Sequence, residues 1–326
     1  MSTVTAVPAD HRVVVPSPPA DPQPAEVWPL TGLSSVDATA EAKAAPSLDV
    51  KIENTPDARP QKGLEYADIV FEEYVEYGVS RLMAVFQSTF PDSVGPVRSL
   101  RPMDPNIAGS FNGAVVFSGA NAGVLRDAKK TGELLLAQDL HSKGFFRVRT
   151  KPAPHNLWAT VSALLEQASA KTAPPQQFDY AYPSSLASAA VSGTPTTHVA
   201  IRLSKISKPT WDWDSGSGTW LRSETSGPMM TFDGARISAT NVVVLRVNVR
   251  YVYGFLPETL MFVDHAPGFV LTDGKYLPIL WSKADRTDTI HLFTETGEPV
   301  ALAPGKTWVE LLPQAGSKDT QSIDFG

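Results

Sequence analysis

Two arginines with a serine between them form the most chemically suggestive segment of the chain. Residues 95–104 read Gly-Pro-Val-Arg-Ser-Leu-Arg-Pro-Met-Asp, so Ser99 lies between Arg98 and Arg101, and Asp104 follows three residues later. In a helical turn, Arg98, Arg101 and Asp104 would share one face. A guanidinium group binds carboxylate or phosphate through two parallel hydrogen bonds. The spacing therefore predicts an anion site, and the alternative is that both arginines pair with acidic residues inside the fold.

A second basic segment ends in a histidine. Arg147, Arg149 and Lys151 precede Pro152-Ala153-Pro154, and His155 and Asn156 follow. A histidine in this setting can act as a general base or bind a metal. Asn156 can donate to an oxyanion or cap a helix. The alternative is that His155 is a hydrogen-bonded structural residue of a loop.

Acidic residues are concentrated in an earlier segment. Asp68 and Glu72 flank Ile69-Val70-Phe71, and on a strand Asp68, Val70 and Glu72 share one face. Carboxylates at strand ends can bind Mg²⁺ or Ca²⁺, but pairing with arginine is the more frequent arrangement. We therefore place Asp68, Glu72 and Arg81 with the anion-binding residues, and predict neither a metal site nor a cofactor.

Composition excludes several classes of function. The chain has 326 residues, a net charge of −6 and no cysteine, which excludes disulfides, thiolate zinc sites, iron–sulfur clusters and cysteine nucleophiles. The acidic balance gives no electrostatic case for nucleic acid as a partner. No apolar run reaches about 18 residues, so the chain is not expected to span a membrane. Walker A, Gly-x-Ser-x-Gly, His-Glu-x-x-His and EF-hand motifs are absent.

The first half of the chain is expected to mix strands and helices. Residues 48–54 alternate apolar and polar side chains, which predicts a half-buried strand. Further strands are expected over 67–76, 82–88 and 114–117. Helices are expected over 121–130 and 160–171, the second with Thr160 as its N-cap.

The second half is expected to be mostly β. Strands are predicted over 198–203, 219–223, 241–247, 260–263, 269–271, 278–282, 290–293 and 307–312, with turns at Asp233-Gly234, Asp273-Gly274 and Thr296-Gly297. Trp211, Trp213 and Trp220 surround a glycine-rich turn. These tryptophans are expected to fill the core of a β domain, and an exposed aromatic surface is the alternative.

These elements predict a two-domain α+β protein, with a mixed α/β N-terminal domain and a mostly β C-terminal domain. We expect a disordered Pro/Ala-rich tether over 1–28, an N-terminal domain over 29–172, a linker over 173–195, a C-terminal domain over 196–315 and a frayed tail over 316–326. The given residues contain no signal-peptide pattern, but a Pro/Ala-rich tether favours an exported protein. A cytosolic protein is the alternative.

Several motifs together resemble the DUF3048 family, the YerB-like lipoproteins of Gram-positive bacteria. The resemblance covers about residues 29–313. In the first half it rests on Pro29-Leu30-Thr31-Gly32, Ala58-Arg59-Pro60-Gln61, Ala67-Asp68-Ile69-Val70-Phe71-Glu72, Ser80-Arg81, Gly95-Pro96-Val97-Arg98-Ser99-Leu100-Arg101 and Ala153-Pro154-His155-Asn156-Leu157. In the second half it rests on Asn241-Val242-Val243-Val244, Trp281-Ser282-Lys283 and Leu302-Ala303-Pro304-Gly305-Lys306-Thr307-Trp308-Val309.

The resemblance implies a two-domain α+β protein, usually anchored outside the membrane, whose function is unknown. This sequence departs from the family at the lipobox cysteine, because it contains no cysteine. It also has Phe71 and Ser80 where the family usually has Tyr and Thr, and neither change alters the charge argument.

We therefore expect an uncharacterised, extracytoplasmic, cell-envelope-associated protein that binds an anionic envelope component, such as a teichoic-acid-like or peptidoglycan-derived group. Arg98 and Arg101 would clamp it, while Ser99 and Asn156 would donate hydrogen bonds.

Two other functions stay open. The chain could be a hydrolase or transferase acting on an envelope phosphodiester or glycopolymer, with His155 as general base and Asp104 or Glu72 to orient it. It could also be a purely structural protein whose second domain docks another envelope or cytosolic protein.

Overall fold

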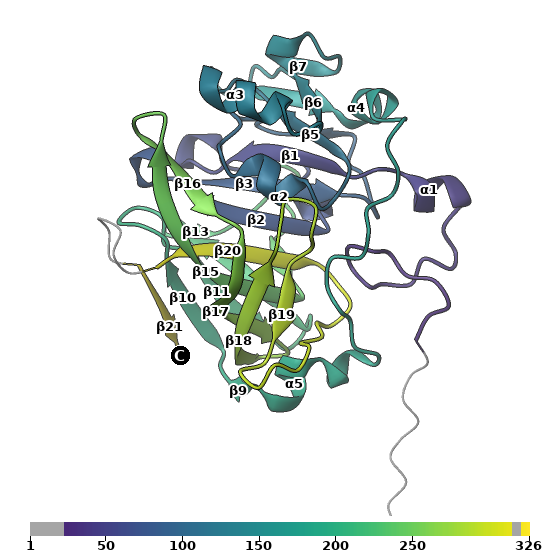
Figure 1. Cartoon of the computed structure of the whole chain (residues 1–326), viewed down its shortest axis with the longest axis vertical. Helices are drawn as coiled ribbons and strands as arrows, with labels where there is room; N and C mark the ends of the chain where they lie inside the picture. The colour runs from purple at the N-terminus through teal and green to yellow at the C-terminus, as the bar shows by residue number, and fades with distance from the viewer. Residues whose placement is uncertain (1–22, 315–320) are drawn as a thin grey trace, which may run out of the picture.

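A single twelve-stranded sheet runs through both halves of the chain (Figure 1). The structure is a computed structural model that describes residues 23–314 and 321–326, so most of the expected tether, residues 1–22, lies outside the described residues. The strands of the main sheet, in spatial order, are β19 (His291–Phe293), β18 (Lys275–Lys283), β17 (Val263–Thr272), β15 (Asn241–Val252), β20 (Thr307–Pro313), β2 (Ile69–Tyr74), β3 (Ser80–Phe86), β1 (Leu48–Glu53), β5 (Ala114–Phe117) and β6 (Leu134–Ala137). Two further strands join it at the side: β16 (Leu256–Leu260) on β15 and β9 (Thr194–Pro195) on β18.

The two halves meet inside this sheet. Strand β20 lies parallel to β2, and their register runs from Ile69 opposite Thr307 to Glu73 opposite Leu311. Strand β20 also lies parallel to β15, so a strand from the end of the chain joins the N-terminal strands to the C-terminal ones. The segment expected as a linker, 173–195, contains a short helix and strand β9, which pairs with β18.

Two smaller sheets complete the β structure. One consists of β13 (Gly227–Pro228), β12 (Thr219–Glu224), β11 (Thr210–Asp214), β10 (His198–Arg202) and β21 (Ser322–Phe325), with β14 (Ser238–Ala239) beside β12. The other consists of β4 (Ser93–Val94), β8 (Leu157–Thr160) and β7 (Phe145–Arg147). The expectation of a frayed tail is wrong for 322–325, because β21 is hydrogen-bonded along β10.

The helices are short. They are α1 (Ala40–Ala44), α2 (Asp104–Ala108), α3 (Ala122–Lys129), α4 (Val161–Gln167) and α5 (Ser188–Ser192), with single 3₁₀ turns η1 (Pro56–Ala58), η2 (Leu64–Tyr66), η3 (Glu76–Gly78), η4 (Gln138–Leu140) and η5 (Ser184–Leu186). Both helices expected from the sequence, α3 and α4, are present. The N-terminal half, expected as mixed α/β, is also largely strand. Within the described residues, no helix is long and apolar enough to cross a membrane.

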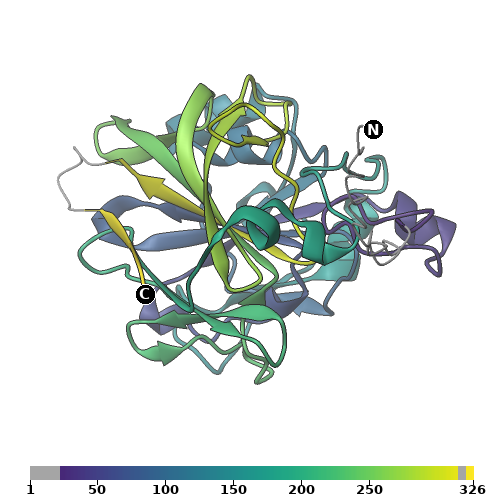
Figure 2. The same cartoon turned by 90° about the horizontal axis from the view of Figure 1, so that it is seen from below.

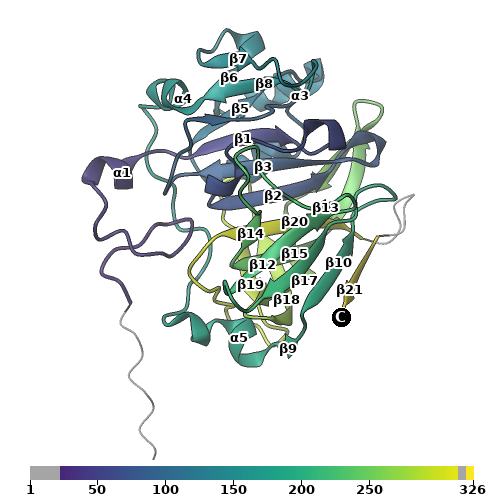
Figure 3. The ribbon, with the colours of Figure 1, turned by 180° about the vertical axis from the view of Figure 1, so that it is seen from behind.

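The main sheet is buried on both faces. One face packs against α2, α3 and β16, with Phe71, Met83 and Val309 at its centre. The other face packs against the two smaller sheets, which lie over it when the molecule is seen from behind (Figure 3). Figure 2 shows the same arrangement from below.

Burial on both faces corrects the expectation of a half-buried strand over 48–54. All six residues of β1 are buried, including Asp49, Lys51 and Glu53. These charged side chains are tolerated because they find partners inside the fold: Ser47 for Asp49, Glu73 for Lys51, and the cluster described below for Glu53.

The tryptophan hairpin belongs to the core. Strands β11 and β12 form a hairpin around the glycine-rich turn, and Trp211 and Trp220 are completely buried. The alternative of an exposed tryptophan surface for docking is therefore not realised at these two residues. The strand predicted over 260–263 is wrong, because the chain turns there between β16 and β17.

Candidate functional site

Two groups of polar side chains gather where β1 ends and β3 begins. Glu53, the last residue of β1, lies opposite Arg81 of β3. Side chains of alternate residues point to opposite faces of a strand. The end of this strand pair therefore presents one polar group on each face of the main sheet.

The basic cluster is defined by Arg81, Arg98, Arg101 and His155 around the carboxylates of Glu53 and Glu76. Glu53 is buried, with 2% of its side chain exposed, and two of the predicted residues converge on it. Its Oε1 lies 3.3 Å from Nε of Arg98, and its Oε2 lies 3.0 Å from Nδ1 of His155. The hydroxyl of Thr55 donates to the same Oε1 at 3.1 Å.

Arg81 and Arg101 share the second carboxylate. Arg101 donates to Glu76 through Nε, at 2.8 Å, and through Nη2, while Arg81 Nη2 lies 3.5 Å from it. Burial, followed by the charges of Arg101 and Arg98, lowers the pKa of Arg81 to about 10. Burial tends to raise the pKa of Glu76, but the hydrogen bond from Arg101 and the charges of both arginines outweigh it, so that pKa is lowered.

Positive charge is left over in this cluster. Three arginines face two carboxylates, so the cluster carries one more positive than negative charge, although each arginine has an acidic neighbour. Neither Nη atom of Arg98, nor Nε2 of His155, has a hydrogen-bond partner among residues 23–314 and 321–326. Both side chains reach solvent, with 25% of Arg98 and 19% of His155 exposed. The Nη groups of Arg98 can donate to an incoming anion, and Nε2 of His155 can do so when both ring nitrogens carry a proton, because Nδ1 needs its own proton to donate to Glu53.

The expected helical turn through the two arginines is wrong. Residue Arg98 is extended: its N–H donates to the carbonyl of Lys51, and its own carbonyl accepts from Ser118. Helix α2 begins only at Asp104, with proline at its first turn. Arg98 and Arg101 therefore both precede the helix.

Asp104 is buried away from His155. Its Oδ1 accepts from Lys51 Nζ at 2.7 Å, and its Oδ2 accepts from the backbone N–H of Arg101 at 2.5 Å. Lys51 also donates to Glu73, and all three side chains of this ion group are completely buried. Glu53, rather than Asp104 or Glu72, therefore orients the imidazole.

Three further predicted residues lie outside the basic cluster. The two carboxylate oxygens of Asp68 accept from the backbone N–H groups of Gln87 and Ser88 and from the Ser88 hydroxyl. Asn156 joins two parts of its own loop, accepting from Arg147 at 2.7 Å and donating to the carbonyl of Val148. Ser99 contributes its backbone: its carbonyl accepts from Arg81 and Arg101.

Glu72 points to the opposite face of the sheet and pairs with an arginine that the sequence analysis missed. Arg222 of β12 is completely buried and donates to Glu72 and, at 2.7 Å, to Glu224. The guanidinium carbon of Arg222 lies 4.7 Å from the ring centre of Trp308 and 5.7 Å from that of Trp211. This ion network of Glu72, Arg222 and Glu224 joins strand β2 of the main sheet to strand β12 of the six-stranded smaller sheet.

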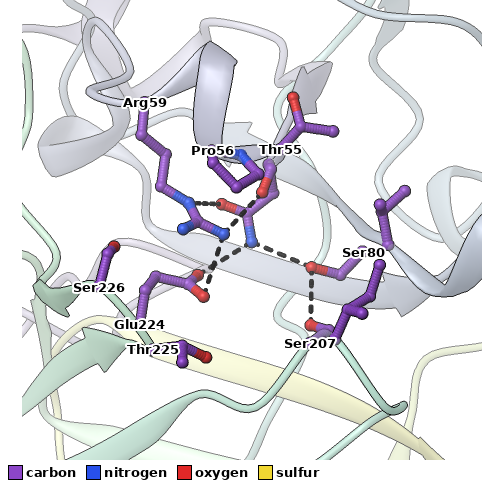
Figure 4. A pocket seen from close by; sticks show the side chains of 11 residues that line it. Thr55, Pro56, Arg59, Ser80, Ser207, Glu224, Thr225 and Ser226 are labelled. Atoms are coloured by element: carbon purple, nitrogen blue, oxygen red, sulfur yellow. Dashed lines mark hydrogen bonds and ion pairs between the residues drawn. The ribbon is translucent and has the colours of Figure 1, made fainter.

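Glu224 of this ion network also lines a cavity of about 300 Å³, here called the junction pocket. The pocket lies between the end of the β1–β3 pair and the six-stranded smaller sheet. In Figure 4 the side chains of Arg59, Ser80, Ser207 and Glu224 converge in this pocket. Its lining residues are Asn54, Thr55, Pro56, Arg59, Val79, Ser80, Ile206, Ser207, Glu224, Thr225 and Ser226. The Arg59 and Ser80 segments belong to motifs in the sequence, but nothing in the sequence indicated that they meet.

Metal binding has no support in the described ranges 23–314 and 321–326. There, no three His, Cys, Asp or Glu side chains are grouped so as to hold a metal ion. The residues of the basic cluster are mainly hydrogen-bond donors, which suits an anion better than a cation.

Comparison with protein families gives two matches. Residues 30–174 match the model described as "Protein of unknown function (DUF3048) N-terminal domain", and residues 199–309 match that of the corresponding C-terminal domain. Together these two ranges cover well over half of the chain.

Comparison with individual proteins leads to one bacterial protein. The chain is 32% identical over 144 residues to a Bacillus subtilis (strain 168) protein described as "Putative lipoprotein YerB", a match covering 44% of this chain and 43% of that protein. The sequence match thus spans less than half the length of this relative. The crystal structure of YerB from Bacillus subtilis resembles this structure with a TM-score of 0.76 at 22% identity, over 92% of this chain and 99% of that one. That similarity shows a shared fold.

Proposed function

The chain belongs to the DUF3048 family of proteins of unknown function, and from this premise we propose that it is an envelope-associated protein that binds an anionic ligand through the basic cluster. Its relative is described as a lipoprotein, which supports an extracytoplasmic location. The ligand class we propose is a phosphate- or carboxylate-bearing envelope component.

One observation carries the proposal: two partly exposed donors are held on one buried carboxylate. Glu53 forms an ion pair with Arg98, whose Nε lies 3.3 Å from Oε1, and its Oε2 is within hydrogen-bond distance of Nδ1 of His155. Among residues 23–314 and 321–326, the Nη groups of Arg98 and Nε2 of His155 have no hydrogen-bond partner, and they lie in a cluster with one more positive than negative charge. Arg81 and Arg101 are engaged with Glu76, so they contribute charge behind the site rather than direct contacts.

We expect Arg98→Ala to weaken the binding of inorganic pyrophosphate roughly ten- to a hundredfold, because a hydrogen bond to a charged group contributes about 1.5–3 kcal/mol. Isothermal titration calorimetry at low ionic strength measures the affinity. Arg98→Lys keeps the positive charge beside Glu53 but loses the planar fork, so we expect a smaller loss.

The matched control is Arg250→Ala. Arg250 is also a partly exposed arginine in an ion pair, with Glu258 at 2.5 Å, but it lies on the β15–β16 hairpin. The Arg250→Ala substitution should leave pyrophosphate binding unchanged. The proposal is wrong if the wild-type protein binds neither pyrophosphate nor glycerol 3-phosphate. It is also wrong if Arg98→Ala binds pyrophosphate as tightly as the wild-type protein does.

The Glu53–His155 pair favours a second candidate function, a hydrolase or transferase acting on an envelope phosphodiester or glycopolymer. A carboxylate on Nδ1 fixes the ring so that Nε2 can accept a proton from a nucleophile. This proposal expects turnover of bis(p-nitrophenyl) phosphate that is lost in His155→Ala while pyrophosphate binding is weakened far less. No release of p-nitrophenolate by the wild-type protein above the His155→Ala background would count against it.

A further inference from the structure

The junction pocket differs in charge from the basic cluster, although the two share the loop 54–59. Asn54, Thr55, Pro56 and Arg59 line the pocket. The outer side of the same loop is held by Lys151, whose ammonium group donates to the carbonyls of Asp57 and Arg59. Thr55 connects the two sites through its hydrogen bond to Glu53.

Charges within the junction pocket are balanced. Arg59 lies 3.0 Å from one oxygen of Glu224, and Arg222 donates to the other oxygen and to Glu72. Two arginines thus face two carboxylates. Glu310 does not line the pocket and accepts from Trp211, and burial followed by the charge of Glu72 raises its pKa well above the usual value. A pocket of this kind offers no net attraction to an anion.

The walls of the pocket carry hydroxyl groups with unused hydrogen-bonding capacity. The hydroxyls of Thr225 and Ser226 have no partner among the described residues. Ser80 accepts from Asn54 at 3.0 Å and from Ser207 at 3.3 Å, so its own proton is available to a ligand. Ser207 donates to Ser80, so its oxygen can still accept. The free groups therefore include both donors and acceptors, and none of them is charged.

An exposed tyrosine, Tyr77, comes two residues before Val79, which lines the pocket. Tyr77 is 86% exposed and has a left-handed backbone, with φ of 63°. It precedes Gly78, whose carbonyl accepts from Ser204 at 2.5 Å, and Val79, which lines the pocket together with the exposed Ile206. The turn carrying Tyr77 is thus fastened to the 204–207 loop. Residues held in a strained backbone conformation are concentrated at functional sites.

We propose that the junction pocket binds an uncharged, hydroxyl-rich ligand, namely a saccharide unit of an envelope glycan, with Tyr77 as a stacking platform at its mouth. The cavity of about 300 Å³ is at the lower end of the range for small-molecule sites, which suits one sugar ring inside and the next on the tyrosine. Sugar hydroxyls both donate and accept, as the free groups of the pocket do, and the C–H face of a sugar packs on Pro56, Val79 and Ile206. This site is distinct from the basic cluster.

The test is calorimetric titration of the full chain with the neutral trisaccharides triacetylchitotriose and maltotriose. We expect Tyr77→Gly to weaken the binding of at least one of them roughly tenfold. Glycine adopts a positive φ without strain, so this variant removes the ring while sparing the fold. Tyr253→Gly is the matched control, since Tyr253 is also an exposed tyrosine with a positive φ of 49° but lies on the β15–β16 hairpin.

A second variant blocks the pocket itself. Ser226 is exposed at the turn between β12 and β13, so Ser226→Trp should fold and should abolish saccharide binding while leaving pyrophosphate binding unchanged. Arg98→Ala should weaken pyrophosphate binding while leaving saccharide binding unchanged. The inference is overturned if wild type binds neither trisaccharide, or if Tyr77→Gly and Ser226→Trp both bind as tightly as wild type. Either failure leaves the anion proposal standing, because that proposal is measured with pyrophosphate.

Discussion

Arg222→Met is expected to lower the free energy of unfolding by about 3–5 kcal/mol, the usual cost of removing one partner from a buried ion group. Arg222 is completely buried, and its removal leaves Glu72 and Glu224 without their cationic partner. Burial alone would lower the pKa of Arg222, but the charges of Glu224, Glu72 and Glu310 outweigh it and raise that pKa, so the arginine is charged. Urea unfolding followed by tryptophan fluorescence measures the change.

Two further variants separate this effect from lost packing. Arg250→Met is the surface control, and we expect a change below about 1 kcal/mol, as is usual for an exposed ion pair. Adding Glu72→Gln and Glu224→Gln to Arg222→Met removes the unpaired charges and should recover part of the lost stability. A loss of less than about 1 kcal/mol in Arg222→Met would show that the ion network does not hold the two halves together.

The second large effect is a decline in stability with rising pH that depends on Glu73. Burial, followed by the nearby charge of Asp104, raises the pKa of Glu73 to about 8. The folded protein then keeps a proton that the unfolded chain releases near pH 4.5, so between these pH values the folded state binds more protons and stability falls as the pH rises. Over the whole window the contribution of Glu73 is of the order of 5 kcal/mol.

Glu73→Gln isolates this contribution, because glutamine resembles the protonated acid in shape. We expect its stability relative to wild type to increase steadily from pH 5 to pH 8, measured by urea unfolding at each pH. Glu298→Gln, a change at an exposed residue, should show no such trend. A difference between Glu73→Gln and wild type that stays constant with pH would mean that Glu73 is ionised in the folded protein throughout.

The sequence predicted many of the individual elements but not how they assemble. Helices α3 and α4, the hairpin around the glycine-rich turn and most of the strands follow from local patterns. The alternation over 48–54 was misleading, because it predicts one exposed face. Lys51 is instead buried between Glu73 and Asp104, which lie 22 and 53 residues away in the chain. No local pattern indicates such partners.

The residues of the candidate site were likewise predictable from the sequence only in part. Arg98 and His155 were identified from their residue types and neighbours, and the structure places both on Glu53. The role of Glu53 was missed, because within the sequence it is only one polar residue of an alternating strand. The junction pocket was missed as well: Ser80, Ser207 and Glu224 come from distant segments, and they meet only because β20 joins the two halves of the sheet.

The most direct test of anion binding is the crystal structure of the protein soaked with inorganic pyrophosphate. We predict that the pyrophosphate lies within hydrogen-bond distance of the Nη atoms of Arg98 and of Nε2 of His155, with Glu53 still holding both side chains. A saturated crystal in which pyrophosphate is bound elsewhere, or in which Arg98 and His155 contact only water, would contradict the account.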